Sequence, residues 1–414
     1  MSASTLVVRH YGRHVGTITR AASGGLCFAY APSWLEADKS FALATELPLR
    51  EGQVETSYFA NLLPEARARA RICRMAGISV DNDFAFLRAF GADCAGSLSI
   101  TDPAETPALA DDDDYLLLSD DDGARLATSG GFANFFRPGG RVRLSLAGAQ
   151  NKLAVVKLGD ELAVPLNGRP STHVLKLPSA EFKGLVENEA IVLSMARALG
   201  LPVVEHTVVR LGGVPMLLVT RYDRELRGDE VLRLHQQDMC QASGLPPDIK
   251  YESEGGLSLR RVFERVRAEV DDPLTASNAL VRWVVFNVLV HNADAHAKNV
   301  SMLRTQDESQ TLAPFYDLVC TGAYELDHTM AMAIGGQFDP GALARASWIR
   351  LAADIDVGVS LVLRTLQEMA ERVPDVLSEE LAQLQNELGR VPRRQQLERT
   401  IRRRSKKAIA LLAS

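Results

Sequence analysis

The sequence changes its hydrophobic pattern near Leu232, and this change limits the folds that the chain can adopt. Before this point, short runs with alternating apolar residues predominate, such as TLVVRH, KLAVVKL and VPMLLVTRY. Such alternation is typical of strands with one buried face. After it, apolar residues recur at helical spacing, as in LSLRRVFERVRAEV and VGVSLVLRTLQEMAERV. The sequence therefore predicts a part that mixes strands with helices, followed by a part that is almost all helical.

Changes in composition divide the chain further. Two aspartate clusters, with proline and glycine pairs, lie between Thr101 and Gly140, a pattern typical of a solvated connector. Within the α/β part, LVENEAIVLSMARALG is expected to be a helix that stops at Gly200 and Pro202. We predict four segments: a small α/β subdomain (1–105), an acidic connector (106–140), an α/β part (141–224) and a helical part (225–414).

Composition also narrows the class of protein. The net charge of -6 gives no overall cationic field for nucleic acid. The five cysteines are scattered without a CxxC pair, which argues against a disulfide framework and against a zinc site. The first residues contain no apolar leader, and the longest apolar run, WVVFNVLV, is too short to cross a bilayer and is interrupted by Asn287. We therefore expect a cytoplasmic protein without a membrane partner.

The stretch HNADAHAKN, residues 291–299, follows directly on the apolar run VRWVVFNVLV. Phosphoryl transfer needs a carboxylate to orient or deprotonate a hydroxyl, and an amide oxygen nearby to hold a metal bound to nucleotide phosphates. Asp294 and Asn299 supply both from one short loop. Further on, Asp317 in FYDLVCT could supply a second, charged ligand to Mg²⁺. Either pattern alone is common by chance.

A lysine on a strand adds to this set. Lys176 lies in THVLKLP, where a buried ammonium group needs a phosphate or a carboxylate partner. Glu189 in the next predicted helix is a candidate partner, since a lysine–glutamate pair positions the lysine on nucleotide phosphates. Glu187 competes with it, and both could instead be surface carboxylates.

Two further motifs lie along the chain, one before Lys176 and one after it. SLAGAQNK, which ends at Lys152, contains one glycine among small residues and could let backbone N–H groups approach an anion. It lacks the GxxxxGK[ST] pattern of a Walker loop, so on its own it indicates only a turn. VTRYDR, residues 219–224, could form a hinge that presents backbone groups to an adenine ring. The order of loop, lysine, glutamate, hinge, D-x-x-x-x-N and aspartate is that of a two-lobed kinase.

These motifs, with others along the chain, make the sequence similar to one known family. GRHVGTITR, YFANLLPEARARARICRMAG and FGADCAGSLSI resemble the first domain of the HipA-like serine/threonine kinases, toxins of bacterial type II toxin–antitoxin systems. STHVLKLP, RLHQQDMCQASGLPPDIKYESEGG, HNADAHAKN and YDLVCT resemble successive parts of their kinase region. The resemblance implies an α+β, two-lobed protein-kinase-like fold, with an extra small N-terminal subdomain on the α/β lobe and an all-α C-terminal lobe.

The resemblance also implies roles for single residues in an enzyme that uses ATP and Mg²⁺. Asp294 matches the catalytic aspartate, and Asn299 and Asp317 match the magnesium ligands. Ser145 matches a serine whose autophosphorylation switches the kinase off. The expected contacts to ATP come from the loop, the lysine strand and the hinge: Ala147, Gly148, Ala149, Gln150, Lys152, Lys176, Val219, Thr220 and Arg221.

We also make predictions for other polar residues near these motifs. His296 is a second catalytic candidate, which either stabilises charge on the transferring phosphate or holds the loop in shape. We expect His291 to pack at the helix end and Lys298 to be solvated. Asp223 and Arg224 are expected to form a structural ion pair.

The family's partners follow from the resemblance as well. They are a small HipB-like helix-turn-helix antitoxin, operator DNA reached mainly through that antitoxin, and a protein substrate, typically the glutamyl aminoacyl-tRNA synthetase. The basic segment 390–414 is either a solvated helix or a direct contact with DNA phosphates. Two alternatives stay open: a co-repressor that does not need catalysis, and a kinase of a different substrate.

Overall fold

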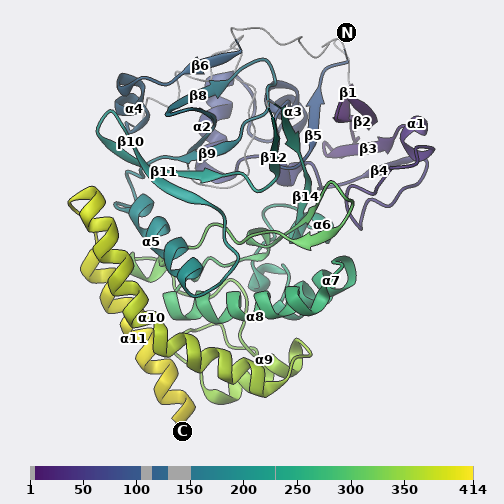
Figure 1. The fold of residues 1–414 in the computed structure, drawn as a ribbon. Coiled ribbons are helices and arrows are strands. Elements are labelled where there is room, and N and C mark those ends of the chain that lie inside the picture. Colours follow the sequence, from purple (N-terminus) through teal and green to yellow (C-terminus); the bar gives the residue numbers. More distant parts are fainter. Residues whose placement is uncertain (1–4, 104–113, 129–150, 229, 414) are drawn as a thin grey trace. The chain divides into compact units, whose positions relative to one another are not determined.

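The computed structural model describes residues 5–103, 114–128, 151–228 and 230–413 (Figure 1). They form two compact units: the first is Met1–Leu177 with Val209–Asp248, and the second is Pro178–Val208 with Ile249–Ser414. Strands predominate in the first unit and helices in the second, so the expected α+β fold class is confirmed. The units do not coincide with the four predicted segments, whose borders stay a prediction.

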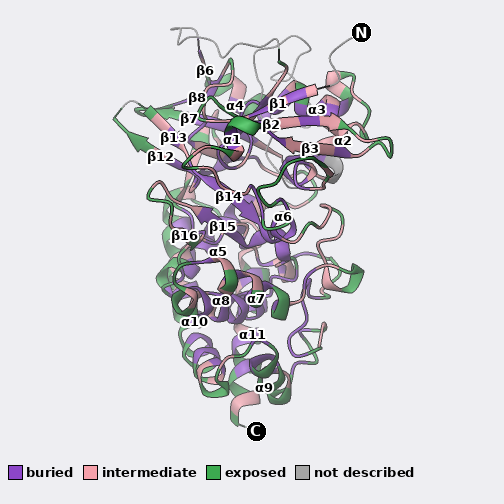
Figure 2. Ribbon diagram, turned by 90° about the vertical axis from the view of Figure 1, so that its right-hand side faces the viewer, coloured by how far each residue is buried: buried purple, intermediate pink, exposed green. Residues whose placement is uncertain are grey.

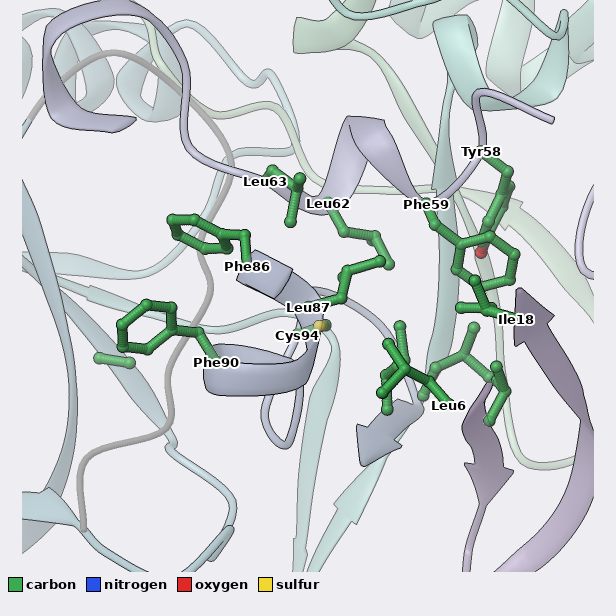
Figure 3. Close-up of a cluster of buried hydrophobic side chains, with 14 of the residues drawn as sticks. Leu6, Ile18, Tyr58, Phe59, Leu62, Leu63, Phe86, Leu87, Phe90 and Cys94 are labelled. Atoms are coloured by element: carbon green, nitrogen blue, oxygen red, sulfur yellow. The ribbon is translucent and has the colours of Figure 1, made fainter. Parts of the chain in front are cut away.

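The first unit begins with an antiparallel sheet whose strands lie in the order β4-β3-β2-β1-β5. Leu6 and Val8 in β1 are fully buried, as the alternation in TLVVRH predicts. Figure 3 shows Leu6 and Ile18 from this sheet near aromatic and aliphatic side chains of the segments that connect β4 to β5. The elements are β1 (Thr5–His10), β2 (Arg13–Arg20), β3 (Leu26–Tyr30), α1 (Pro32–Leu35), β4 (Gln53–Glu55), α2 (Ala66–Ala76), α3 (Asp83–Phe90) and β5 (Leu98–Thr101).

A second sheet has the strand order β10-β11-β9-β7-β8-β6. Strand β9 lies between β7 and β11, and both neighbours run antiparallel to it. The central position of β9 explains why Leu175 is fully buried. The strands are β6 (Tyr115–Leu117), β7 (Lys152–Leu158), β8 (Glu161–Pro165), β9 (His173–Lys176), β10 (His206–Leu211) and β11 (Val214–Thr220).

Part of the predicted acidic connector is regular structure. Strand β6 pairs with β8, and helix α4 (Asp120–Leu126) follows it. Ser119 caps this helix in a capping box with Asp122, and the acidic residues lie in its first turn, where the helix dipole favours negative charge. Gly123 is required here, because a Cβ would lie 2.5 Å from the backbone of Leu211. The second aspartate cluster therefore starts a packed helix.

A buried ionic cluster joins the two sheets of the first unit. The carboxylate of Asp93, just before β5, lies 2.8 Å from Arg224 Nη2 and 3.4 Å from both Arg221 Nη1 and Arg233 Nη2. Asp223 Oδ2 forms two further ion pairs, with Arg221 Nη2 at 2.7 Å and with Arg224 Nη1 at 3.0 Å. The expected Asp223–Arg224 pair is therefore confirmed, within a network of two carboxylates and three guanidinium groups.

Short elements after this cluster complete the first unit. The hairpin of β12 and β13 is antiparallel. Asp238 caps the helix that follows in a capping box with Gln241. These elements are β12 (Arg224–Arg227), β13 (Glu230–Arg233), β14 (His235–Asp238) and α6 (Met239–Ala242).

Among the described residues, the second unit contains six α-helices and one β-hairpin. Strands β15 (Ser301–Arg304) and β16 (Gln310–Leu312) pair antiparallel. Helices α10 and α11 lie side by side (Figure 1). The second unit is thus mostly helical, and its hairpin is a departure from the all-α lobe that the family resemblance implied. Its α-helices are α5 (Leu185–Ala198), α7 (Leu259–Glu269), α8 (Pro273–Val290), α9 (Arg345–Asp354), α10 (Val359–Leu388) and α11 (Arg394–Ala413).

Helix α8 is the apolar centre of the second unit. Asp272 caps its N-terminus by accepting a hydrogen bond from Thr275 N, and Pro273 occupies the first turn, where no N–H is needed. The helix has 18 residues with a mean hydropathy of 1.3, so by length and composition it could cross a membrane. The apolar run WVVFNVLV is only part of it, so judging by that run alone underestimated the length of the apolar segment. Since 67% of it is buried inside the protein, it has the character of a core helix (Figure 2).

Candidate active site

Two lysines lie directly opposite each other in the second sheet. Lys176 in β9 pairs in register with Lys152 in β7. Side chains of directly opposed residues point to the same face of a sheet, with Cβ atoms about 5 Å apart. Two ammonium groups at this distance destabilise the sheet unless negative charge lies near them, and Lys176 is only 5% exposed. The sheet therefore places two cationic side chains in one row.

An apolar row lies beside the cationic one on the same face. Val174 in β9 is opposed by Ala154 in β7 and by Val219 in β11. Because side chains two positions apart share a face, Val174 points the same way as Lys176, about 7 Å along the strand. A small apolar row beside a cationic row fits a flat base joined to a phosphate chain. Lys152, Lys176 and Val219 are thus brought together, as the sequence predicted.

The predicted hinge follows β11. Thr220 is exposed at the end of the strand, opposite His173. The backbone N–H of Arg221 donates to Thr172 O at 3.0 Å, and its side chain is buried in the ionic cluster. Arg221 therefore holds the end of β11 in place with its own side chain.

Glutamates of α5 are buried in the second unit. Glu189 is 1% exposed and Glu187 is 6% exposed, so the alternative of surface carboxylates is wrong. Between them, Asn188 makes two hydrogen bonds to the backbone of Cys320. Its Nδ2 donates to Cys320 O at 3.0 Å, and its Oδ1 accepts from Cys320 N at 2.9 Å. This pair of bonds ties the helix of Glu189 to the loop that carries Asp317.

The loop HNADAHAKN begins where α8 ends. His291 adopts a left-handed conformation with a φ of 57°, which terminates the helix. Asn292 then bridges the turn, because its Nδ2 donates to Asn287 Oδ1 at 2.8 Å and its Oδ1 accepts from Asp294 N at 3.2 Å. The helix and the turn together set the direction of Asp294.

Asp294 and Asn299 are brought together, as the sequence predicted. Asn299 Nδ2 donates to the carbonyl oxygen of Asp294 at 3.1 Å. The Asp294 side chain is 55% exposed, whereas His291, His296 and Asn299 are buried. One exposed carboxylate thus projects from a loop that is otherwise mostly packed into the protein.

Asp317 is held near this loop by the residue before it. The hydroxyl of Tyr316 donates to Lys298 O at 2.7 Å and lies 2.6 Å from Ser301 Oγ, on either side of Asn299. Asp317 itself has a positive φ of 53°, which is uncommon for a residue other than glycine and occurs often at functional sites.

The donor set of Asn299 and Asp317 fits a magnesium ion. The amide nitrogen of Asn299 donates to Asp294 O, so Asn299 would bind a cation through its side-chain oxygen. Magnesium in nucleotide sites is bound by one or two protein side chains, and phosphates and water complete its octahedron. One carboxylate with one amide oxygen meets this requirement.

Of two predictions for residues of this loop, one is wrong and the other is confirmed. Lys298 was expected to be solvated, and this is wrong: the residue is 6% exposed because the 3-10 turn Ala297–Asn299 folds it inward. His291 packs at the helix end as expected. Burial, with Arg404 and His328 nearby, lowers the pKa of His291 to about 4, so the ring is neutral at pH 7.

Several predicted site residues lie outside the described residues. They are Ser145, Ala147, Gly148, Ala149 and Gln150. Their roles stay predictions.

The sequence did not single out three residues that hold the site: Tyr251, Asn188 and Tyr316. Each acts through contacts with residues that are distant in the sequence. Tyr251 lies inside RLHQQDMCQASGLPPDIKYESEGG, one of the stretches that resemble the family, and this was the one available signal for it.

The basic C-terminal segment forms α11, which packs into the second unit through Leu397 and Ile401. Arg404 is buried and caps the C-terminal end of α8, because its Nε donates to Val288 O at 3.3 Å. The remaining exposed cations recur at helical spacing along one side of α11, and they are Arg399, Arg403, Lys406 and Lys407.

Comparison with known families gives two matches. Residues 6–101 match the family model of the HipA N-terminal domain, and residues 144–377 match that of the HipA-like C-terminal domain. Together these matches include every predicted site residue.

Two similar proteins are named as kinases. The chain is 37% identical over 394 residues to the Y4mE protein of Sinorhizobium fredii, which is named as a kinase, with 91% of this chain and 92% of that protein covered. It is 30% identical over 380 residues to the serine/threonine-protein kinase toxin HipA of Shewanella oneidensis, with 86% and 84% covered.

A solved structure agrees with these relatives. The chain superposes on a chain of the Shewanella oneidensis complex of HipA, HipB and operator DNA with a TM-score of 0.84 and 27% sequence identity, and the match covers 99% of this chain and 98% of the other. Two family matches, a relative at 30% identity and this likeness in fold agree. The chain therefore belongs to the HipA family of serine/threonine-protein kinase toxins.

Proposed function

We propose that this chain transfers the γ-phosphoryl group of ATP to a serine or threonine of a protein and thereby arrests growth. The observation that carries this proposal is the loop in which Asp294 alone presents an exposed carboxylate while Asn299 fixes its backbone. A carboxylate held in this way can accept the proton of an acceptor hydroxyl. Membership of a family of kinase toxins supports the same reaction.

The remaining site residues would bind the nucleotide. Lys152 and Lys176 would neutralise phosphate charge, and the row of Ala154, Val174 and Val219 would contact the base. Asn299 and Asp317 would hold magnesium. When bound, the metal neutralises charge that develops on the transferring phosphate.

For the substrate, we propose a serine in an aminoacyl-tRNA synthetase, such as the glutamyl enzyme, so that translation stalls in the cytoplasm. Phosphorylation of Ser145 would switch the kinase off, because it adds up to about two negative charges next to a site that binds ATP phosphates. Incubation of the purified chain with labelled ATP and a panel of aminoacyl-tRNA synthetases tests the substrate. Label in another protein, and in none of the panel, would overturn this choice but leave the kinase proposal standing.

We expect Lys176→Ala to weaken ATP binding at least about 10-fold, because charged hydrogen bonds to phosphate contribute about 1.5–3 kcal/mol. Calorimetric titration with ATP and magnesium measures the change. Lys157→Ala is the matched control, since Lys157 lies on the same strand as Lys152 but is exposed. Equal ATP affinity in Lys176→Ala and the control would contradict the role of Lys176.

We further propose a HipB-like antitoxin and, through it, operator DNA as partners. These are the partners in the Shewanella oneidensis complex that this chain resembles in fold. The exposed cations of α11 could add a direct contact with DNA phosphates.

Replacing Arg399, Arg403, Lys406 and Lys407 by glutamine tests the contact between α11 and DNA. Each phosphate contact that is lost lowers the salt slope of operator binding by about 0.9, so we expect a shallower slope for the complex with the antitoxin. Binding is measured at several salt concentrations. The control is the double variant in which the exposed residues Arg50 and Lys157 are replaced by glutamine. An unchanged slope in the fourfold variant would show that α11 does not contact DNA.

A further inference from the structure

Tyr251 contacts the catalytic carboxylate directly. Its hydroxyl donates to Asp294 Oδ1, with the two oxygens 2.7 Å apart. The ring of Tyr251 meets the ring of His296 edge to face, with centroids 5.6 Å apart and an interplanar angle of 74°. Nε2 of His296 lies 3.9 Å from the same oxygen, Oδ1. Both neighbours therefore approach one side of the Asp294 carboxylate.

The segment around Tyr251 is anchored so that its hydroxyl stays in this position. Glu252, the next residue, donates its N–H to Ala331 O at 2.9 Å and accepts from Ala333 N at 2.7 Å through Oε2. The N–H of Ala331 in turn donates to Ala293 O at 2.8 Å, directly beside Asp294. Tyr251 and Asp294 are thus fixed to the same short stretch of chain.

The two oxygens of Asp294 have different surroundings. Among the described residues, no side chain or backbone group donates a hydrogen bond to Oδ2, and the side chain is 55% exposed. A carboxylate that is held through one oxygen keeps few rotamers, and loss of such an orientation costs rate even when the reactive group remains.

We propose that Tyr251 is a positioning residue, which fixes Asp294 through Oδ1 so that Oδ2 accepts the proton of the substrate hydroxyl. This inference rests on the proposed kinase function. In the step, the hydroxyl oxygen bonds to the γ-phosphorus of ATP while the bond from that phosphorus to the bridging oxygen breaks. The electron pair of that bond leaves with ADP, and the hydroxyl proton passes to Oδ2.

The same geometry assigns a role to His296. Its ring is buried and packs against Tyr251, and it faces the oxygen that Tyr251 already occupies. His296 therefore supports the position of the tyrosine ring, which is the loop-shaping role of the two considered for it.

Tyr251→Phe tests the inference, because it removes one hydroxyl and keeps the ring that packs on His296. We expect kcat to fall about 10- to 100-fold while KM for ATP changes less than about twofold, since orientation of the base acts on the chemical step. Glu252→Ala, which releases the anchor, is expected to lower kcat in the same direction. Tyr11→Phe is the matched control, since its hydroxyl donates to Arg233 O in the other unit. Wild-type kcat in Tyr251→Phe would overturn the proposal.

Crystal structures of the wild type and of Tyr251→Phe separate this inference from the kinase function. We expect one ordered Asp294 rotamer in the wild type and more than one in the variant. If the wild type transfers no phosphate to any acceptor, the proposed function fails, and these structures alone judge the positioning role. The same single Asp294 rotamer in both proteins would overturn that role.

Discussion

Asp294→Asn is expected to lower phosphoryl transfer by about 100- to 10,000-fold, the range that a positioned general base contributes. The amide cannot take up a proton from the acceptor hydroxyl at neutral pH. Its oxygen can still accept the hydrogen bond from Tyr251, and its backbone carbonyl still accepts from Asn299. The loop should therefore keep its shape, and ATP affinity should change little. Transfer of labelled phosphate and growth arrest on expression measure the effect.

A matched variant distinguishes the role of Asp294 from a general effect of lost charge. Glu308→Gln also neutralises one exposed acid of the second unit, in the turn between β15 and β16. We expect it to keep wild-type transfer and toxicity. Toxicity that persists in Asp294→Asn would rule out the kinase account and favour a co-repressor that acts without catalysis.

Asp93→Asn is expected to lower the stability of the first unit by about 3–5 kcal/mol, the usual cost of removing one partner from a buried ion pair. The asparagine would leave Arg221, Arg224 and Arg233 without their shared carboxylate. Chemical unfolding followed by circular dichroism measures the loss. Asp102→Asn breaks the more exposed pair with Arg88 and should cost no more than about 1 kcal/mol. Equal costs in the two variants would contradict the importance of the cluster.

The same carboxylate predicts a dependence on pH. Burial alone would raise the pKa of Asp93, but Arg224, Arg221 and Arg233 more than offset it, so the pKa is lowered. A lowered folded-state pKa gives stability that is fully present above the unfolded value of about 4 and is lost as the pH falls below it. The stability difference between wild type and Asp93→Asn should therefore be constant near neutral pH and shrink in acid. A difference that grows below about pH 4 would contradict this account.

The sequence predicted those parts of the site that a local pattern encodes. Asp294 and Asn299 stand five positions apart in one loop, and Lys176 lies in a strand with clear alternation. The register of β7, β9 and β11 could not be read from the sequence, because pairing depends on residues far apart in the chain. Only the structure shows that Lys152 opposes Lys176.

Two details of the structure have physical causes of the same kind. The aspartates near Asp122 were expected in a solvated connector, and Asp120 and Asp121 are exposed, but they also form the first turn of α4, where the helix dipole favours them. Lys298 was expected in solvent because lysine is rarely buried. Its backbone oxygen accepts from Tyr316, which holds this part of the loop within the fold. Neither feature produces a periodic pattern of residues that could be recognised in the sequence.

The two hydrogen bonds between Asn188 and Cys320 have a consequence for control from outside the site. Displacing α5 would break both bonds or pull the loop of Asp317 along with the helix. A protein or a small molecule that binds only α5 could therefore silence the enzyme without touching Asp294 or competing with ATP. Such an inhibitor would act without occupying the ATP site itself, and variants that resist it would cluster on α5, far in sequence from Asp294.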